Sequence, residues 1–471
     1  MDKVRGRNII RVPAKASIWY IASSAVARSV SVVGTPIFTR LLTAREYGIF
    51  PQYTTYLSLF TVVATLELSG GVILRGLQKF EDRRAEFISC AIGLIATVWA
   101  VTSAVILSFS AIFGDFTGLG NRVLWLMLFH VLLNAIISVY TAEARYSYKY
   151  RAVAATNIVI AILTPLVAVL LISAFSVGGV GRIYASLFSA TVVALPFLFI
   201  IFERSKRLYD GEIWRYLLRF SIPFLPHYFS AAIIIRIGEV MLSRVHGSEA
   251  LAKYSVAMSV GLSLSVITNG VLSALSPWML RRVRAGDIRQ SRSLLFVATR
   301  GLSIVTLLVL SIVPETIRIV APPEYHDCLF AVYPLALSVL PTFLSNAIVA
   351  GEMYFERSAV ASLPTVVAAI VTVVLTTLFS PFIDYRAVAV FLPIAYVITC
   401  SLNCLVFKKM SGEMPILIGK SAIIYLLTVG YALLIFAFRE LFWVRAILAL
   451  PLVFPLFSTA KETLSTIREK K

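Results

Sequence analysis

The chain has 471 residues, of which 59% are hydrophobic and 14% are charged, and its mean hydropathy is +0.87. A soluble protein carries about 25% charged residues, so this composition excludes a soluble globular enzyme and indicates a chain that crosses a membrane many times. The formal net charge of +19 raises nucleic-acid binding as an alternative, which the distribution of the charges decides.

Hydrophobic segments of roughly 20 residues, the length of a transmembrane helix, recur along the whole sequence. The pattern predicts an all-α integral membrane protein of about fourteen transmembrane helices, arranged as two six-helix lobes plus two C-terminal helices. The predicted helices are 15–42, 47–74, 87–113, 122–142, 152–175, 180–202, 215–242, 252–280, 293–314, 328–350, 360–380, 386–407, 416–437 and 441–459.

The charges predict the orientation of the chain. Most of the 43 Lys and Arg residues fall on the side of the membrane that the N-terminus shares. By the positive-inside rule both termini are expected in the cytoplasm, and the net charge reflects topology, not nucleic-acid binding. No apolar segment with a small-residue cleavage site follows the N-terminus, so no signal peptide is expected. The predicted parts are a basic cytoplasmic N-terminus (1–14), an N-lobe (15–203), a cytoplasmic linker (204–214), a C-lobe (215–409), two further helices (410–459) and a cytoplasmic tail (460–471).

The stretch "TRLLTAREYGIF", from Thr39 to Phe50, is the predicted outer turn between the first two helices. Thr43 followed by Glu46 is a capping-box pattern, in which each side chain bonds a backbone N–H group at the start of a helix. Gly48 is expected to allow close approach of a neighbouring backbone. This polar stretch is therefore predicted to begin the second helix.

A looser copy of this stretch, "SRVHGSEALAKYSV", returns at residues 243–256 after the seventh predicted helix. The helix before each copy contains proline: Pro36 in the first, Pro223 and Pro226 in the seventh. Helix-breaking residues at corresponding positions of two similar halves point to the substrate path of an alternating-access transporter. The three prolines are predicted as hinges, although kinks without a hinge role are also common in membrane helices.

The segments "TPIFTRLLTAREYGIF", "LELSGGVILRG", "RFSIPFLPHYFSAAIIIRIGEVMLSRV" and "LSPWMLRR" resemble the polysaccharide-synthesis membrane family of O-antigen and exopolysaccharide flippases. That family belongs to a group with the multidrug and toxin extrusion transporters and the lipid II flippases. The resemblance implies a cavity between helices 1–6 and 7–12. It also implies, as substrate, an oligosaccharide on a polyprenyl pyrophosphate that moves from the cytoplasmic to the outer leaflet.

Arg28 is the strongest candidate for binding an anionic substrate group. A charge at the centre of a membrane helix costs about 2.5–3.5 kcal/mol, so such groups face a water-filled path or each other. Arg28 lies near the middle of the first helix beside small residues, and a structural ion pair with Glu67 is the alternative. Arg236 is a second candidate, but Glu239 three residues later is close enough to pair with it.

The other candidates have competing roles. Glu67 is expected either to bind a coupling proton or sodium ion or to pair with Arg28, and Glu239 is a coupling or ion-pair candidate. Arg300 is a possible anion contact, although a side chain eight residues from Arg292 can also reach the cytoplasmic surface. His130 and Asn134 share one face of the fourth helix, where they either bind substrate or pack.

Nothing in the sequence resembles hydrolase or transferase chemistry: there is no phosphate-binding glycine loop and no zinc-ligand spacing. No metal and no cofactor are expected, and coupling to protons or sodium is left open. The expectation is a transporter of the cytoplasmic (inner) membrane, with the bilayer, the lipid-linked oligosaccharide and the polysaccharide polymerase and assembly machinery as partners. A cation-coupled multidrug exporter of the same fold is the first alternative. A membrane polymerase and a non-transporting scaffold are the others.

Overall fold

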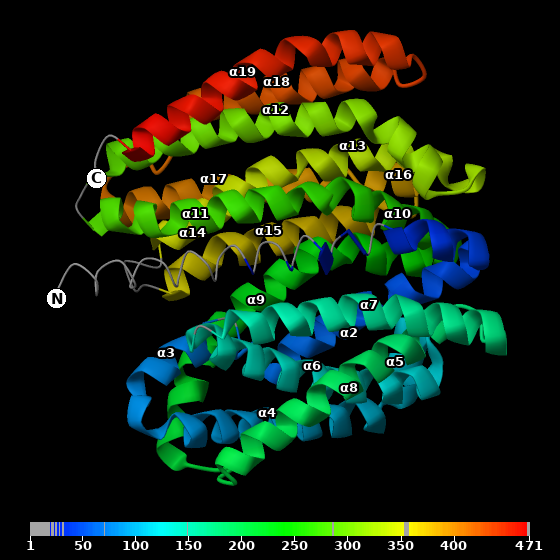
Figure 1. Ribbon diagram of the computed structural model, residues 1–471, viewed down its shortest axis with the longest axis vertical. Coiled ribbons are helices and arrows are strands. Elements are labelled where there is room, and N and C mark those ends of the chain that lie inside the picture. The colour runs from blue at the N-terminus through cyan, green and yellow to red at the C-terminus, as the bar shows by residue number, and fades with distance from the viewer. Residues whose placement is uncertain are drawn as a thin grey trace. The chain divides into compact units, whose positions relative to one another are not determined.

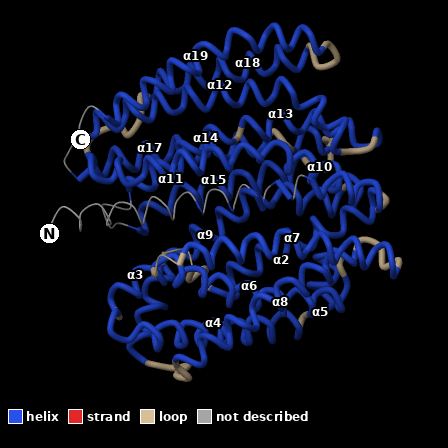
Figure 2. The backbone as a smooth tube through the Cα atoms, viewed as in Figure 1, coloured by secondary structure: helices blue, strands red, loops and turns tan. Residues whose placement is uncertain are grey.

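The computed structural model describes residues 19, 23, 26–27, 29–30, 33–69, 71–147, 149–284, 287–352 and 358–468. These residues are largely helical and contain no strand, and Figure 2 shows the helices joined by short loops. Twelve helices among them are long and apolar enough to cross a membrane. They match the third to fourteenth predicted helices, so the prediction of an all-α membrane fold is confirmed.

The first packing unit, Met1–Ala252, ends within α10. The long helix α9 packs against α2, α3 and α4 of this unit, and α6 packs against α8. The elements of this unit are α2 (Ala44–Thr65), α3 (Val72–Lys79), η1 (Glu81–Arg83), α4 (Arg84–Ser108), α5 (Ser110–Thr117), α6 (Gly120–Tyr146), α7 (Tyr150–Phe175), α8 (Val180–Arg204), α9 (Gly211–Val245) and the first turns of α10 (Gly247–Gly261).

The second unit, Lys253–Lys471, contains the remaining helices. The last two, α18 and α19, run alongside α12 (Figure 1). The predicted domain boundaries, which place a linker at 204–214, remain predictions. The elements of this unit are η2 (Leu262–Leu264), α11 (Ser265–Arg284), α12 (Ile288–Val320), η3 (Pro323–Cys328), α13 (Leu329–Leu337), α14 (Val339–Glu352), α15 (Ser358–Phe379), α16 (Tyr385–Val388), α17 (Phe391–Ser411), α18 (Ile418–Ala437) and α19 (Phe442–Arg468).

The predicted continuous helix over 47–74 is wrong, because the structure breaks it after Thr65. Leu66 and Glu67 adopt positive φ angles of 51° and 44°, which end α2, and Gly71 has φ 123° before α3 begins. The sequence "LSGG" supplies two adjacent glycines here, and glycine is the least favourable helix former after proline. Glu67 therefore lies in the turn between α2, of 22 residues, and α3, of 8 residues, and not inside a continuous helix.

The predicted outer loop from Pro314 to Asp327 is also largely helical. α12 runs on to Val320, six residues beyond its predicted end, and η3 follows it. Because α12 continues beyond residue 314, Glu315 lies on a packed face of this helix, where it meets the side chain of Arg445 of α19. Nothing in the sequence was a reason to pair these two residues.

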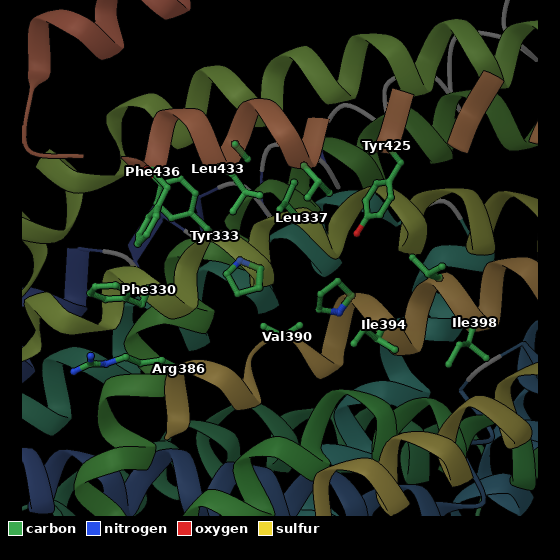
Figure 3. A pocket seen from close by; sticks show the side chains of 15 residues that line it. Phe330, Tyr333, Leu337, Arg386, Val390, Ile394, Ile398, Tyr425, Leu433 and Phe436 are labelled. Carbon is green, nitrogen blue, oxygen red and sulfur yellow. The ribbon is translucent and has the colours of Figure 1, made fainter. Parts of the chain in front are cut away.

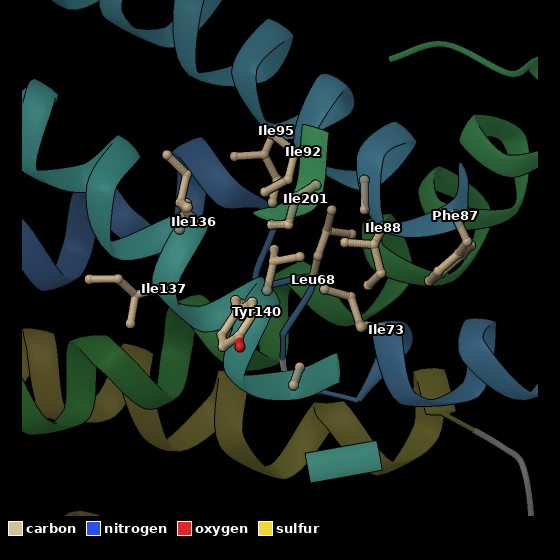
Figure 4. Close-up of a cluster of buried hydrophobic side chains, with 14 of the residues drawn as sticks. Leu68, Ile73, Phe87, Ile88, Ile92, Ile95, Ile136, Ile137, Tyr140 and Ile201 are labelled. Atoms are coloured by element: carbon tan, nitrogen blue, oxygen red, sulfur yellow. The ribbon is translucent and has the colours of Figure 1, made fainter. Parts of the chain in front are cut away.

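The core of the first unit joins α4, α6, α8 and α9 through aliphatic and aromatic side chains (Figure 4). Tyr140 of α6 stacks on Phe197 of α8 with ring centroids 3.8 Å apart. Within a bilayer, van der Waals packing and interhelical hydrogen bonds replace water exclusion as the force between helices. This cluster therefore fixes the helices that carry the polar residues described next.

Candidate functional site

The stretch from Thr39 to Phe50 begins α2 with the predicted capping box. The Glu46 backbone N–H donates to Thr43 Oγ1 over 3.3 Å, and the Thr43 backbone N–H donates to Glu46 Oε2 over 3.1 Å. Both bonds satisfy N–H groups that the first helical turn leaves without partners. The capping prediction is confirmed.

Gly48 and Tyr47 attach this corner to the rest of the first unit. A Cβ atom on Gly48 would lie 1.9 Å from the Ser248 carbonyl oxygen at the start of α10, so only glycine fits, as the sequence predicted. Arg182 of α8 is enclosed by three aromatic rings whose centroids lie 4.3–4.7 Å from its guanidinium carbon; they belong to Phe38, Tyr47 and Phe50. The stretch therefore connects α2, α8 and α10.

Arg236 and Glu239 form the ion pair that their spacing allowed. Arg236 Nη1 lies 2.7 Å from Glu239 Oε2, and Thr55 Oγ1 of α2 donates to the same carboxylate oxygen over 2.6 Å. The Glu239 side chain is 4% exposed, whereas that of Arg236 keeps 29% of its surface exposed. The buried carboxylate thus holds a guanidinium that keeps part of its surface exposed, within the apolar run from Ile222 to Leu242.

His130 is buried against α2. Its Nδ1 lies 2.9 Å from the Tyr53 hydroxyl, and the two rings stack with centroids 5.9 Å apart. Tyr53 and Thr55 lie two residues apart on α2, and they bind His130 and Glu239, both of which were predicted as candidates. Asn134, one turn beyond His130, is half-buried. The packing role that the sequence left open for His130 is the one that these contacts fit best.

The remaining candidates of the first unit lie apart from this network. Arg28 is outside the described residues. Glu67 accepts a bond from Ser69 Oγ over 3.4 Å in the turn after α2, and it interacts electrostatically with Tyr228 of α9. Pro36 lies within the helical residues 33–41, and α9 continues through Pro223 and Pro226. Their hinge role stays a prediction.

In the second unit, Arg300 of α12 turns toward α19. Its Nε donates to Thr459 Oγ1 over 3.1 Å, and the side chain is half-buried. Gly301 beside it keeps this approach close, because a Cβ there would lie 3.3 Å from the Thr459 side chain. The guanidinium thus joins two helices, and its anion-binding role stays a prediction.

Sequence reasoning missed a second ion pair with a buried partner. Arg445 of α19 binds both carboxylate oxygens of Glu315 and the Ser311 carbonyl oxygen, all on α12, and its side chain is 1% exposed. The sequence offered little evidence for this pair, because Glu315 was assigned to a loop and Arg445 to the outer end of the last helix.

Glu352, at the end of α14, was missed as well. It is 1% exposed, and neither carboxyl oxygen has a hydrogen-bond partner within the described part of the chain. In the same described part, no group of three or more His, Cys, Asp or Glu side chains is arranged to hold a metal ion. Among the described residues, Glu352 is therefore an acidic group outside any ligand cluster.

A groove of about 500 Å³ opens between α13, α17 and α18 of the second unit (Figure 3). Its walls are almost wholly apolar and include Pro334 and Pro393, and Arg386 lies at one end. Arg386 pairs with Asp327 over 3.0 Å, so the charge at that end is balanced. The groove has the size and lining of a site for a hydrocarbon chain.

The profile of one protein family, described as polysaccharide biosynthesis protein, matches residues 14–283. The chain belongs to this family. The match covers more than half of the sequence, including the capped corner and all of α9. No curated protein matches the chain.

Solved structures of low sequence identity share the fold of this polysaccharide biosynthesis protein. A lipid II flippase, MurJ, in an inward closed conformation is 12% identical, with a TM-score of 0.68; the match covers 95% of this chain and 99% of that one. An inward-facing multidrug resistance transporter of the MATE family is also 12% identical, with a TM-score of 0.65 and coverage of 83% and 94%. A MATE transporter from Vibrio cholerae is 13% identical, with a TM-score of 0.56 and coverage of 86% and 97%.

Proposed function

We propose that the protein is a flippase that moves polyprenyl-pyrophosphate-linked oligosaccharide repeat units from the cytoplasmic to the outer leaflet by alternating access. It would serve the synthesis of a cell-surface polysaccharide, such as an O-antigen or exopolysaccharide, in the inner membrane. The family membership supports the polysaccharide pathway. The match to a lipid II flippase covers 95% of this chain, whereas the match to a multidrug transporter covers 83%. The larger coverage by the flippase supports a lipid-linked substrate.

The observation that carries this proposal is the partly exposed Arg236, held at a fixed position by Glu239 and Thr55. A guanidinium in a membrane helix binds phosphate oxygens through parallel N–H groups. An exporter of cationic drugs needs acidic groups at such a position, not an exposed arginine. Arg28 and Arg300 are the further predicted anion contacts and Asn134 is a predicted polar contact, whereas the contacts of His130 favour packing.

The apolar groove of the second unit offers a place for part of the prenyl chain. Its volume of about 500 Å³ and its apolar walls fit isoprene units better than sugars. The prenyl chain would then stay in an apolar environment during transport. Proton or sodium coupling, with Glu67 or Glu239 as the carrier, and contact with a polymerase remain proposals.

The test uses cells that lack this protein and a sugar-labelling probe that cannot cross the bilayer. Without the protein, completed lipid-linked units should collect on the cytoplasmic face, and the wild-type protein should restore outward movement. The Arg236→Gln variant should lower the flipping rate roughly tenfold or more, since a charge-assisted bond contributes about 1.5–3 kcal/mol. Arg236→Lys keeps the charge and should retain more activity than Arg236→Gln.

Three outcomes would count against the proposal. Normal outward movement in cells without the protein would contradict a flippase and favour the multidrug exporter. Single units stalled on the outer face would indicate a polymerase. Full activity of Arg236→Gln would remove Arg236 from the path while leaving the flippase assignment standing.

A further inference from the structure

The N-terminal part of α9 borders a hollow that none of the roles above uses. The hollow measures about 680 Å³, and it combines guanidinium groups with aromatic and apolar side chains. Such a lining suits a ligand that has a charged head and an apolar body. The lining residues are Tyr209, Gly211, Trp214, Arg215, Leu218, Arg219, Ile222 and Pro223.

The two arginines of this hollow differ from the other arginines nearby. Arg83 and Arg207 both pair with Asp210, over 2.8 and 3.1 Å. Arg215 and Arg219 are exposed, lie one helical turn apart on the same face, and make no hydrogen bond or ion pair within the described residues. A turn of α-helix rises about 5.4 Å, so two guanidinium groups at this spacing can bind one phosphate between them.

The aromatic wall of the hollow is fixed before any ligand arrives. Trp214 Nε1 donates to the carbonyl oxygens of Cys90 and Leu208, over 3.1 and 3.2 Å. The Tyr209 ring packs edge-on against Trp214 with centroids 4.9 Å apart, and its side chain is 65% exposed. Tryptophan and tyrosine with this exposure are typical of the interface between hydrocarbon and water.

The length of α9 places the hollow at the headgroup level. The helix has 35 residues, which span about 52 Å at 1.5 Å per residue, against a hydrocarbon core of about 30 Å. The apolar run from Ile222 to Leu242 fills that core, so Arg215 and Arg219 extend beyond it at the predicted cytoplasmic end. The fixed anions at that depth are phospholipid phosphates, and the headgroups of acidic lipids carry a net negative charge.

We propose that this hollow binds one acidic phospholipid of the bilayer. The phosphate lies between Arg215 and Arg219, the glycerol backbone lies against Trp214 and Tyr209, and an acyl chain follows Ile222 and Pro223. Bulk phospholipid is the occupant because it is abundant at this depth and carries a single phosphate to match one pair of guanidinium groups. The site does not depend on what the protein transports.

The experiment uses the full-length protein in a neutral detergent, with equal amounts of phosphatidylglycerol and phosphatidylcholine added. Native mass spectrometry then counts the lipids that each protein retains. The wild type should retain one phosphatidylglycerol in preference to phosphatidylcholine. The Arg215→Gln/Arg219→Gln variant should retain about tenfold less. The control Arg122→Gln/Arg318→Gln removes the same charge from exposed arginines elsewhere and should change retention by less than twofold.

Further variants distinguish a loss of lipid binding from misfolding. Arg215→Gln and Arg219→Gln alone should each lower retention about threefold, and Arg215→Lys/Arg219→Lys should fall between the wild type and the double Gln variant. Equal losses in the control pair, or equal retention of phosphatidylcholine, would overturn the proposal. Displacement of phosphatidylglycerol by equimolar polyprenyl diphosphate would reassign the site to the carrier lipid, and displacement by millimolar inorganic phosphate would show that no lipid is recognised.

Discussion

Two arginines of membrane helices, one in each unit, are paired with glutamate in different ways. Arg445 binds both oxygens of Glu315 and a backbone carbonyl, and 1% of its side chain is exposed. Arg236 is bonded to Glu239 through one nitrogen, and 29% of its side chain is exposed. Arg445 is the buried partner of the first pair, and Glu239 is the buried partner of the second.

Which of the two side chains is buried determines whether the ion pair can bind a ligand. An enclosed guanidinium with three acceptors has little capacity left for a ligand, so the Arg445 pair attaches α19 to α12. An enclosed glutamate with an exposed arginine presents positive charge while its own charge is balanced. Burial of the acidic partner therefore distinguishes Arg236, which we propose to bind substrate, from Arg445, although both lie in membrane helices.

Removing Glu315 should produce the largest effect. Glu315→Leu leaves Arg445 buried without its carboxylate and should lower the free energy of unfolding by about 3–5 kcal/mol. Chemical denaturation of the purified protein in micelles measures this loss. The double variant Glu315→Leu/Arg445→Met replaces the pair by apolar side chains and should recover to within about 1 kcal/mol of the wild type.

An exposed pair between the same two helix ends supplies the control. Arg318 and Glu440 lie 2.7 Å apart, with 52% and 66% of their side chains exposed. Glu440→Leu should change the free energy of unfolding by no more than about 1 kcal/mol. If Glu315→Leu cost no more than this control, the Arg445 pair would not be the structural link between α12 and α19.

Thr55 tests the second pair with a smaller change. Thr55→Val keeps the shape of the side chain but removes the donor to the buried Glu239 carboxylate, and should lower the free energy of unfolding by about 1.5–3 kcal/mol. Thr54→Val is the matched control, because Thr54 bonds only the Pro51 carbonyl oxygen of its own helix. Equal stability of the two variants would mean that Thr55 does not hold Glu239 in place.

The sequence predicted the parts of the site that local spacing controls. The capping box of Thr43 and Glu46 and the pairing of Arg236 with Glu239 follow from neighbours within four residues. At Gly48 the sequence predicted a close approach but not the distant backbone that makes it. Thr55 could not be predicted as a partner of Glu239, because the two are 184 residues apart and meet only through the packing of α2 on α9.

Errors in helix boundaries hid the other pair. The pattern ended the ninth helix at residue 314, whereas α12 reaches Val320, so Glu315 was read as a loop residue. The break after Thr65 was missed for the opposite reason, since apolar residues continue on both sides of it. Hydrophobicity sets where a segment can lie in a bilayer, but backbone geometry and long-range contacts set where its helices end.

An ion pair outside the membrane completes the comparison and should show the smallest effect. Asp210 caps α9 by accepting the backbone N–H groups of Glu212 and Ile213, and it accepts a bond from Arg83 over 2.8 Å. The hydrogen bond from Arg83 is the main cause that lowers the pKa of Asp210 below its ordinary value. A carboxyl whose pKa falls on folding stabilises the folded state above its unfolded pKa of about 3.9, and that stabilisation disappears as pH falls through the folded value.

Asp210→Asn isolates the charge, because asparagine is as good a helix cap as aspartate. The variant should melt slightly below the wild type at pH 7, and the two melting temperatures should converge as the pH falls below about 4. Asp210→Ala, which also loses the cap, should remain less stable than Asp210→Asn at every pH. A wild-type advantage over Asp210→Asn that persisted at low pH would contradict the role of the charge. Convergence would show that the pairing of arginine with a carboxylate, so costly to break at Glu315, contributes little where the arginine is exposed, as Arg83 is.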